Sequence, residues 1–213
     1  MPDAVITIGQ LNGWVHRFHD LVIKNQAELT QLDSAVGDAD HGINMARGMT
    51  AVINKLAGDQ PRHANELFKT VAMTLVTSVG GASGPLYGTF FLRFAGAAGP
   101  ATELDAEAVD MALRAGLAGI VERGKAAPGD KTMVDALSPA LDAMEALIKD
   151  GGDLAAAVTA ARDAAAAGRD ATVPLAARKG RASYLGERSA GHMAPGAASM
   201  SLLFDALAAE ISS

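Results

Sequence analysis

The chain has no cysteine among its 213 residues, and this absence excludes several kinds of site. Disulfide frameworks, thiolate nucleophiles and cysteine-ligated zinc or iron–sulfur centres all need that residue. Aromatic residues make up only 4% of the chain, and β-branched runs are short, which argues against an extensive sheet. No stretch of about 18 consecutive apolar residues occurs, although a membrane-spanning helix needs one. The first ten residues show no basic and then apolar signal pattern, so we expect a soluble, cytoplasmic protein.

The chain also has no excess of positive charge. It has 18 Lys and Arg residues and 24 Asp and Glu residues, which gives a net charge of −6 and a pI near 5.3. We therefore expect neither a nucleic acid nor a membrane surface as a partner, although a local basic pocket stays open. With 49% hydrophobic and 20% charged residues, the composition is that of a globular protein. The length suggests one domain, spanning residues 1–213.

The spacing of apolar residues predicts an all-α protein. Apolar residues recur at helical spacing in several segments, namely 11–22, 45–56, 67–75, 109–120, 137–148 and 200–211. With an alanine-rich segment at 153–168 and a helix after residue 83, we expect about eight helices in an antiparallel bundle or barrel. Asp105 and Thr132 are expected to cap helix starts. Residues 174–195 form a long, weakly periodic stretch, which is typical of a functional or mobile loop.

The strongest local signal is an acidic cluster in residues 32–45. Asp33 should lie at the end of one helix, and Asp38 and Asp40 should lie in the loop before the next. Three converging carboxylates repel one another unless a cation lies between them, and all-oxygen ligands favour Mg²⁺ or Ca²⁺. The helix that opens near Ile43 offers free backbone N–H groups to an anion.

Plainer interpretations of this cluster stay open. It could be a solvated acidic turn in which Asp40 caps the helix, and His41 on its own is more often a capping or hydrogen-bonding residue than a metal ligand. An EF-hand is excluded, because the bidentate glutamate and the ligand spacing of that loop are missing.

Residues 80–89 form a glycine-rich loop that runs into a helix. With Ser83 as the predicted cap and Pro85 in the first turn, the free N–H groups and the helix dipole would bind an anion. The alternative is a close helix contact that the glycines permit. Residues 119–126 resemble a Walker A loop, but they follow a helix and have Ala126 in place of the metal-binding Ser or Thr. Residues 128–133, which lead into the next helix, could border a ligand.

Basic residues gather in the long stretch before the last helix, at Arg178, Lys179, Arg181 and Arg188. Arginine binds phosphate through two parallel hydrogen bonds, so this cluster suggests a phosphate site, with a solvated basic loop as the alternative. The three signals together supply metal ligands, backbone anion sites and cations. Phosphoryl transfer needs that combination.

Four motifs in order resemble one family, the nucleotide-binding L subunit of bacterial dihydroxyacetone kinase. They are residues 37–45 (GDADHGINM), 80–89 (GGASGPLYGT), 129–135 (GDKTMVD) and 181–189 (RASYLGERS). The resemblance runs from about Thr7 to Leu207. It implies an antiparallel barrel of eight helices with a nucleotide, ADP or ATP, at one end.

The resemblance also implies roles for single residues. Two Mg²⁺ ions that bridge to the nucleotide phosphates would be held by Asp33, Asp38 and Asp40. Residues that would border the nucleotide are His41, Gly42, Ile43, Asn44, Ala82, Ser83, Gly124, Met133, Arg181, Ala194, Pro195 and Gly196. Among these, Ala82 and Ser83 would donate to the phosphates, and Arg181 would offset charge on the transferred group. The family usually has Asp where this chain has Ala194, so any role of that carboxylate is lost.

The implied activity is that of a kinase subunit acting on an alcohol group of dihydroxyacetone (glycerone). A separate K subunit would hold the sugar, and a phosphohistidine protein of the phosphotransferase system would rephosphorylate the bound ADP. Three alternatives stay open: an ATP-dependent subunit for a triose or a four-carbon ketose, a nucleotide-loaded adaptor that signals to a transcriptional regulator, and a di-metal hydrolase. Phosphate transfer to a partner would distinguish a kinase subunit from an adaptor. Hydrolysis without a second subunit would identify a hydrolase.

Overall fold

The computed structural model describes residues 5–212, and their regular structure is almost entirely helical. The helices are α1 (Ile8–Lys24), α2 (Gln26–Val36), α3 (His41–Ala57), α4 (Ala64–Ser78), α5 (Ser83–Ala98), α6 (Ala106–Gly124), α7 (Val134–Lys149), α8 (Leu154–Ala171), the 3₁₀ helix η1 (Arg181–Ser189) and α9 (Pro195–Ile211). Two short strands, β1 (Ile6–Thr7) and β2 (Glu103–Leu104), pair antiparallel. The predicted all-α class is confirmed. Residues 1–4 and 213 of the expected 1–213 domain lie outside the described residues.

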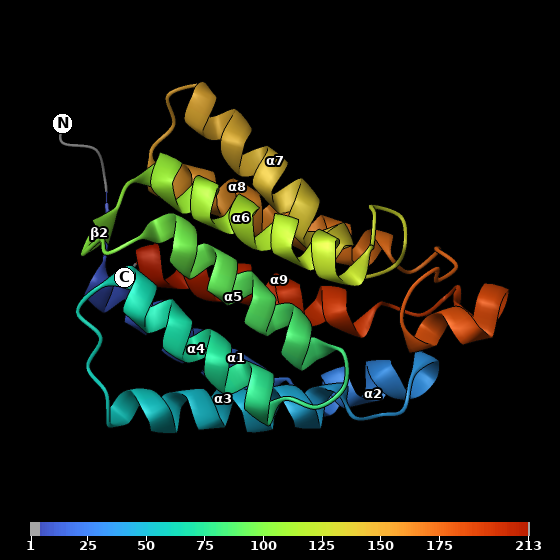
Figure 1. Cartoon of the computed structure of the whole chain (residues 1–213). Coiled ribbons are helices and arrows are strands. Elements are labelled where there is room, and N and C mark those ends of the chain that lie inside the picture. The colour runs from blue at the N-terminus through green and yellow to red at the C-terminus, as the bar shows by residue number, and fades with distance from the viewer. Residues whose placement is uncertain (1–4, 213) are drawn as a thin grey trace.

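Helix α9 lies at the centre of the packing, with α1, α7 and α8 against it (Figure 1). Its sequence is apolar on nearly every face, as expected for a helix that is buried all round. The indole Nε1 of Trp14 on α1 donates to the carbonyl of Leu203 on α9 over 2.9 Å. Trp14 also packs edge-on against Phe68, with ring centroids 5.6 Å apart, and Phe68 lies 4.3 Å from Phe94. Apart from Tyr184, which is exposed, the few aromatic residues are therefore concentrated in one core.

Helix caps follow the sequence at some positions and depart from it at others. Asp105 accepts a hydrogen bond from the backbone N–H of Ala108, as predicted. Thr132 accepts from the N–H of Val134, while its own N–H donates to Asp135, which completes a capping arrangement before α7. The prediction for Ser83 is wrong: its side chain caps no backbone N–H of α5. The hydroxyl is engaged instead by a residue on another helix, described below.

The loops that carry the sequence motifs gather at one end of the bundle (Figure 1). The α2–α3, α4–α5 and α6–α7 loops and the segment with η1 all lie there, whereas β1, β2 and the C-terminal end of α9 lie at the other end. The long stretch before α9 is folded, since η1 occupies much of it. Among the helices of residues 5–212, none has both the length and the apolar character required to cross a membrane.

Candidate functional site

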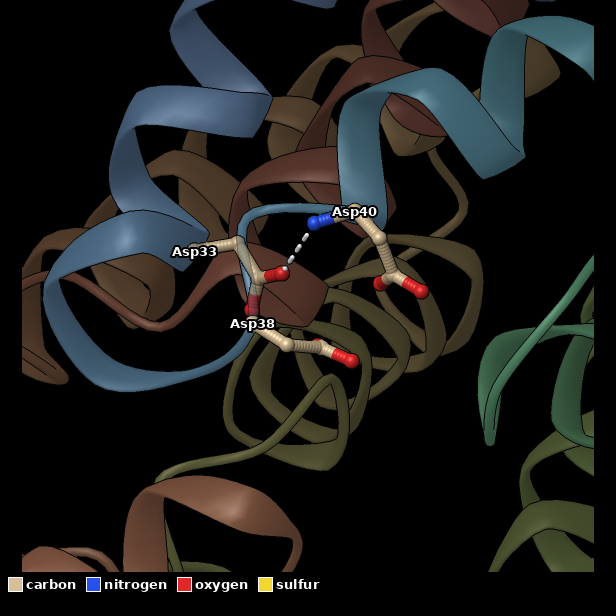
Figure 2. Close-up of side chains that lie close together, drawn as sticks. All are labelled: Asp33, Asp38 and Asp40. Atoms are coloured by element: carbon tan, nitrogen blue, oxygen red, sulfur yellow. Dashed lines mark hydrogen bonds between the residues drawn. The ribbon is translucent and has the colours of Figure 1, made fainter.

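The three predicted aspartates converge at the junction of α2 and α3 (Figure 2). Asp33 lies in the last turn of α2, Asp38 in the connecting loop and Asp40 at the start of α3, and one carboxylate oxygen from each lies within 4.8 Å of the others. The loop is tight: Ala39 adopts a left-handed conformation with φ 61°. Gly37 is required by space, because a Cβ there would lie 2.2 Å from Oδ1 of Asp33.

Backbone groups hold Asp33, whereas Asp38 is paired with the exposed side chain of Arg181. Oδ2 of Asp33 accepts from the N–H of Asp40 over 2.9 Å and from that of His41 over 3.2 Å, at the positive end of the α3 dipole. The carboxylate of Asp40 makes no capping hydrogen bond, which disfavours the interpretation of this residue as a helix cap. Three carboxylates within reach of one point, one of them fixed in orientation, fit a hard divalent cation such as Mg²⁺.

Next to the aspartates lies a cavity of about 390 Å³. Most of the predicted site residues line it: Asp33, Asp38, Asp40, His41, Ala82, Ser83, Gly124, Met133, Arg181, Pro195 and Gly196. The sequence motifs, far apart along the chain, therefore meet around one space. The acidic loop, the glycine loop and the basic stretch supply different walls of it.

Four predicted site residues do not line this cavity. Gly42 packs against α2, where a Cβ would lie 2.2 Å from the carbonyl of Gln26. Asn44 is buried, and its side-chain oxygen accepts from Arg47. Ile43 is 48% exposed, and Ala194 is buried. Their contacts with a nucleotide stay predictions.

Several cavity residues were not among the predicted site residues. They are Val36, Gly80, Gly81, Pro85, Leu86, Ile120, Arg123, Ala126, Lys131, Thr132, Lys179, Gly180 and Ala182. Leu86 and Ile120 give the cavity an apolar wall. Ile120 belongs to an apolar stripe at helical spacing. Such a stripe looks the same in sequence whether the helix face packs in the core or lines a cavity, so no sequence signal could separate the two. Lys131 and Thr132 belong to the stretch 128–133 that the sequence placed beside a ligand.

A chain of hydrogen bonds starts at His41, next to the aspartates in the cavity wall. His41 contacts the hydroxyl of Ser83 through Nδ1 over 3.1 Å and that of Ser199 through Nε2 over 2.9 Å, and Tyr87 reaches Ser199 over 2.8 Å. Burial is the largest influence on His41 and lowers the pKa of its imidazole, against the opposing effect of Asp33. His41 is thus a hydrogen-bonding residue that orients Ser83, as the plainer sequence interpretation held.

The glycine-rich loop makes the close helix contact considered for it and also borders the cavity, while its anion-binding role stays a prediction. A Cβ on Gly84 would lie 2.3 Å from the carbonyl of Val79, and one on Gly88 would lie 2.3 Å from Val76, so these glycines allow α4 and α5 to approach closely. Gly80 and Gly81, by contrast, line the cavity, and Gly81 has φ 65°. The close helix contact and the open loop are built by different glycines of one motif.

The basic stretch reaches the aspartates through a single arginine. Nη2 of Arg181 lies 2.9 Å from Oδ2 of Asp38, and Lys179 also lines the cavity. Arg178 and Arg188 are not among the lining residues. The Arg181 side chain is 66% exposed, so its pairing with Asp38 is weak and can be exchanged for an anion at little cost.

Comparisons with known proteins agree with this geometry. The DAK2 domain family matches residues 35–209. The chain is 42% identical over 199 residues to the PEP-dependent dihydroxyacetone kinase ADP-binding subunit DhaL of Escherichia coli (strain K12), covering 93% of this chain and 95% of that protein. It is 40% identical over 203 residues to the PTS-dependent DhaL subunit of Lactococcus lactis subsp. lactis (strain IL1403), covering 95% and 97%.

A solved structure with the same fold is the dihydroxyacetone kinase of C. freundii in complex with AMP-PNP and Mg²⁺. The two superpose with a TM-score of 0.72 at 30% identity, over 97% of this chain and 35% of that one. The bundle is therefore one that also occurs as part of a longer kinase chain.

Proposed function

This chain belongs to the DAK2 domain family as an ADP-binding DhaL subunit of dihydroxyacetone kinase, and on that basis we propose how it works. It accepts a phosphoryl group on its bound ADP and passes the group to a hydroxyl of dihydroxyacetone, which a separate K subunit holds. The observation that carries the proposal is the aspartate cluster beside the cavity, where three carboxylates meet the N-terminus of α3. A metal-bound diphosphate needs those groups together.

Asp33, Asp38 and Asp40 would hold the Mg²⁺, with two ions expected from the resemblance. Their oxygen-only donor set matches that metal, and the structurally similar C. freundii kinase was solved with Mg²⁺ and AMP-PNP. Bound Mg²⁺ would offset the negative charge of the phosphates and of the group in transfer.

The chain's own residues would bind and orient the nucleotide. Ala82 and Ser83 line the cavity at the N-terminus of α5, where their backbone N–H groups would donate to the phosphates. His41 fixes the Ser83 hydroxyl. Arg181 would turn from Asp38 toward the transferred group and stabilise its charge.

The far wall of the cavity suits the base of the nucleotide. Leu86, Ile120 and Met133 are apolar, and Gly124 leaves room beside them. With the adenine ring placed there, the phosphates of the nucleotide would point toward the aspartates. The residues 194–196 would border the nucleotide where α9 begins, and this segment lies close to Met133: a Cβ on Gly196 would be 3.6 Å from the Met133 backbone nitrogen.

The partners follow from the same family. The names of its relatives point to PEP and the phosphotransferase system, so the phosphate donor is proposed to be a phosphohistidine protein, and the acceptor a dihydroxyacetone-loaded K subunit. A transcriptional regulator as a further partner, the single domain and the cytoplasmic location stay predictions. ATP as the donor is a second candidate, because the structurally similar C. freundii kinase was solved with an ATP analogue.

Mixing the purified chain with the K subunit and dihydroxyacetone tests the proposal. A phosphohistidine donor should produce dihydroxyacetone phosphate, whereas free ATP should not replace it. Turnover with ATP alone would favour the second candidate. If the chain bound nucleotide but passed no phosphate with either donor, it would be an adaptor, and hydrolysis of a phosphoester without the K subunit would identify a hydrolase.

A further inference from the structure

Lys131 lies in the cavity wall with its charged end turned into the protein. The residue is 4% exposed, and its backbone adopts a left-handed conformation with φ 64°, which is uncommon for a residue other than glycine. Its Nζ donates to the carbonyls of Thr172 over 2.8 Å, Leu175 over 2.9 Å and Val173 over 3.3 Å. An ammonium group has three N–H donors, and three backbone carbonyls take them.

This arrangement argues against a direct phosphate contact. A lysine that lines a nucleotide cavity is usually expected to bind phosphate as a point charge. Here the donors are already used, and the carbonyls they reach lie just beyond the last residue of α8, at the negative end of its dipole. Burial lowers the pKa of the Lys131 ammonium, in keeping with acceptors that carry no formal charge. The lysine therefore binds protein rather than ligand.

The carbonyls that Lys131 holds begin a segment that we call the strap, residues 172–194. The strap closes on itself at its base: the N–H of Gly191 donates to Val173 over 2.8 Å, and the N–H of Ala194 donates to the Thr172 hydroxyl over 3.0 Å. A further bond joins the strap to the α6–α7 loop, from the N–H of Arg178 to the carbonyl of Asp130 over 3.1 Å. Lys131 and Asp130 thus fix the strap to the α6–α7 loop.

The part of the strap that holds η1 lies beside α2 and reaches the aspartate cluster. η1 lies within the strap and begins at Arg181, whose guanidinium lies 2.9 Å from Asp38. That ion pair is exposed and weak, so it cannot by itself hold the strap in place. The buried contacts of Lys131 are the stronger attachment, because hydrogen bonds from a charged group in a low-dielectric interior are worth more than those in water.

We infer that Lys131 is a positioning residue: by holding the base of the strap against the α6–α7 loop, it sets Arg181 over the phosphate side of the cavity. The inference rests on the proposed nucleotide site. It assigns to Lys131 no contact with substrate or nucleotide. Its effect on binding and transfer passes through the strap and Arg181.

The Lys131→Met variant of the full chain tests the inference by two measurements. Amide hydrogen exchange in residues 172–194 should become at least about tenfold faster, while exchange in α1 and α9 stays unchanged. ADP, loaded with Mg²⁺ and chased with excess unlabelled ADP, should dissociate at least about tenfold faster, which corresponds to about 1.4 kcal/mol. Lys149→Met, at a lysine that is 69% exposed at the end of α7, is the matched control and should change neither rate.

A double-mutant cycle distinguishes positioning from direct contact. If Lys131 acts through Arg181, adding Lys131→Met to Arg181→Met should change the ADP dissociation rate by less than about twofold. Full additivity of the two effects would overturn the inference, as would a strap whose exchange is unchanged in Lys131→Met.

Further variants keep the test decisive if Lys131→Met does not fold. Lys131→Gln keeps neutral donors and should speed strap exchange by an intermediate factor, and Lys131→Arg keeps the charge and should restore part of the protection. Equal strap exchange in wild type, Lys131→Gln and Lys131→Arg would contradict the inference. A wild-type chain that binds no ADP would refute the proposed function instead, and hydrogen exchange would still report on Lys131.

Discussion

Replacing Gly37 with alanine should weaken metal-dependent nucleotide binding without removing a carboxylate. The new Cβ would lie 2.2 Å from Oδ1 and 3.0 Å from Cγ of Asp33, so the Asp33 side chain would have to move by about 1.2 Å to reach ordinary contact. Its Oδ2 now accepts from two backbone N–H groups, and the longer of those bonds is already 3.2 Å. A shift of that size breaks the bond and turns the carboxylate away from the other two.

The expected loss is roughly 10- to 100-fold in Mg²⁺-dependent ADP affinity, since about 1 Å of misplacement in a site of fixed geometry can cost 10²-fold. Stability should change little, because a partly exposed side chain is what moves. ADP titrations with and without Mg²⁺, together with thermal melts, measure both effects. Gly96→Ala, with nothing within 4 Å of the new Cβ, is the matched control and should bind as the wild type does. If Gly37→Ala bound Mg²⁺ and ADP as tightly as the wild type, the reasoning would be refuted.

Two further predictions concern stability. Phe68 is fully buried against the rings of Trp14 and Phe94. Phe68→Ala should therefore lower the free energy of unfolding, measured by urea titration, by about 3–5 kcal/mol. A loss below about 1 kcal/mol would contradict the core described above. Burial raises the pKa of the Asp205 carboxyl, against the opposing effect of Arg169. The free energy of unfolding therefore falls as the pH rises from 3.8, the ordinary pKa, through the raised pKa of the folded state. Asp205→Asn should therefore melt higher than wild type at pH 7 and lose that advantage at pH 3, and an equal gain at both values would refute the assignment.

The sequence predicted what depends on local spacing. Asp33, Asp38 and Asp40 are within one helix end and one loop, so their meeting follows from a short stretch of chain. The cap at Asp105 is equally local. Periodicity predicted α1, α3, α4, α6, α7 and α9, because a helix that covers a core must repeat its apolar face, whereas α2 and η1 showed no such stripe.

What the sequence could not predict depends on contacts between distant segments. Serine is a residue type that favours helix N-caps, but the hydroxyl of Ser83 forms a hydrogen bond with His41, which lies on another helix. The sequence placed Lys131 only in a segment that could border a ligand, because neither its left-handed backbone nor its distant carbonyl partners can be inferred from the local sequence. Ile120 belongs to an apolar stripe that continues from the core into the cavity wall.

The nucleotide and metal content of the freshly purified chain tests the central claim most directly. The protein is denatured, the supernatant is separated by chromatography, and Mg²⁺ is measured on the same sample, with Asp38→Asn prepared in parallel. The account predicts ADP and Mg²⁺ in stoichiometric amounts in the wild type and a large loss of both in Asp38→Asn. A wild-type chain that contains no adenine nucleotide, and takes up none when ADP and Mg²⁺ are added, would contradict it.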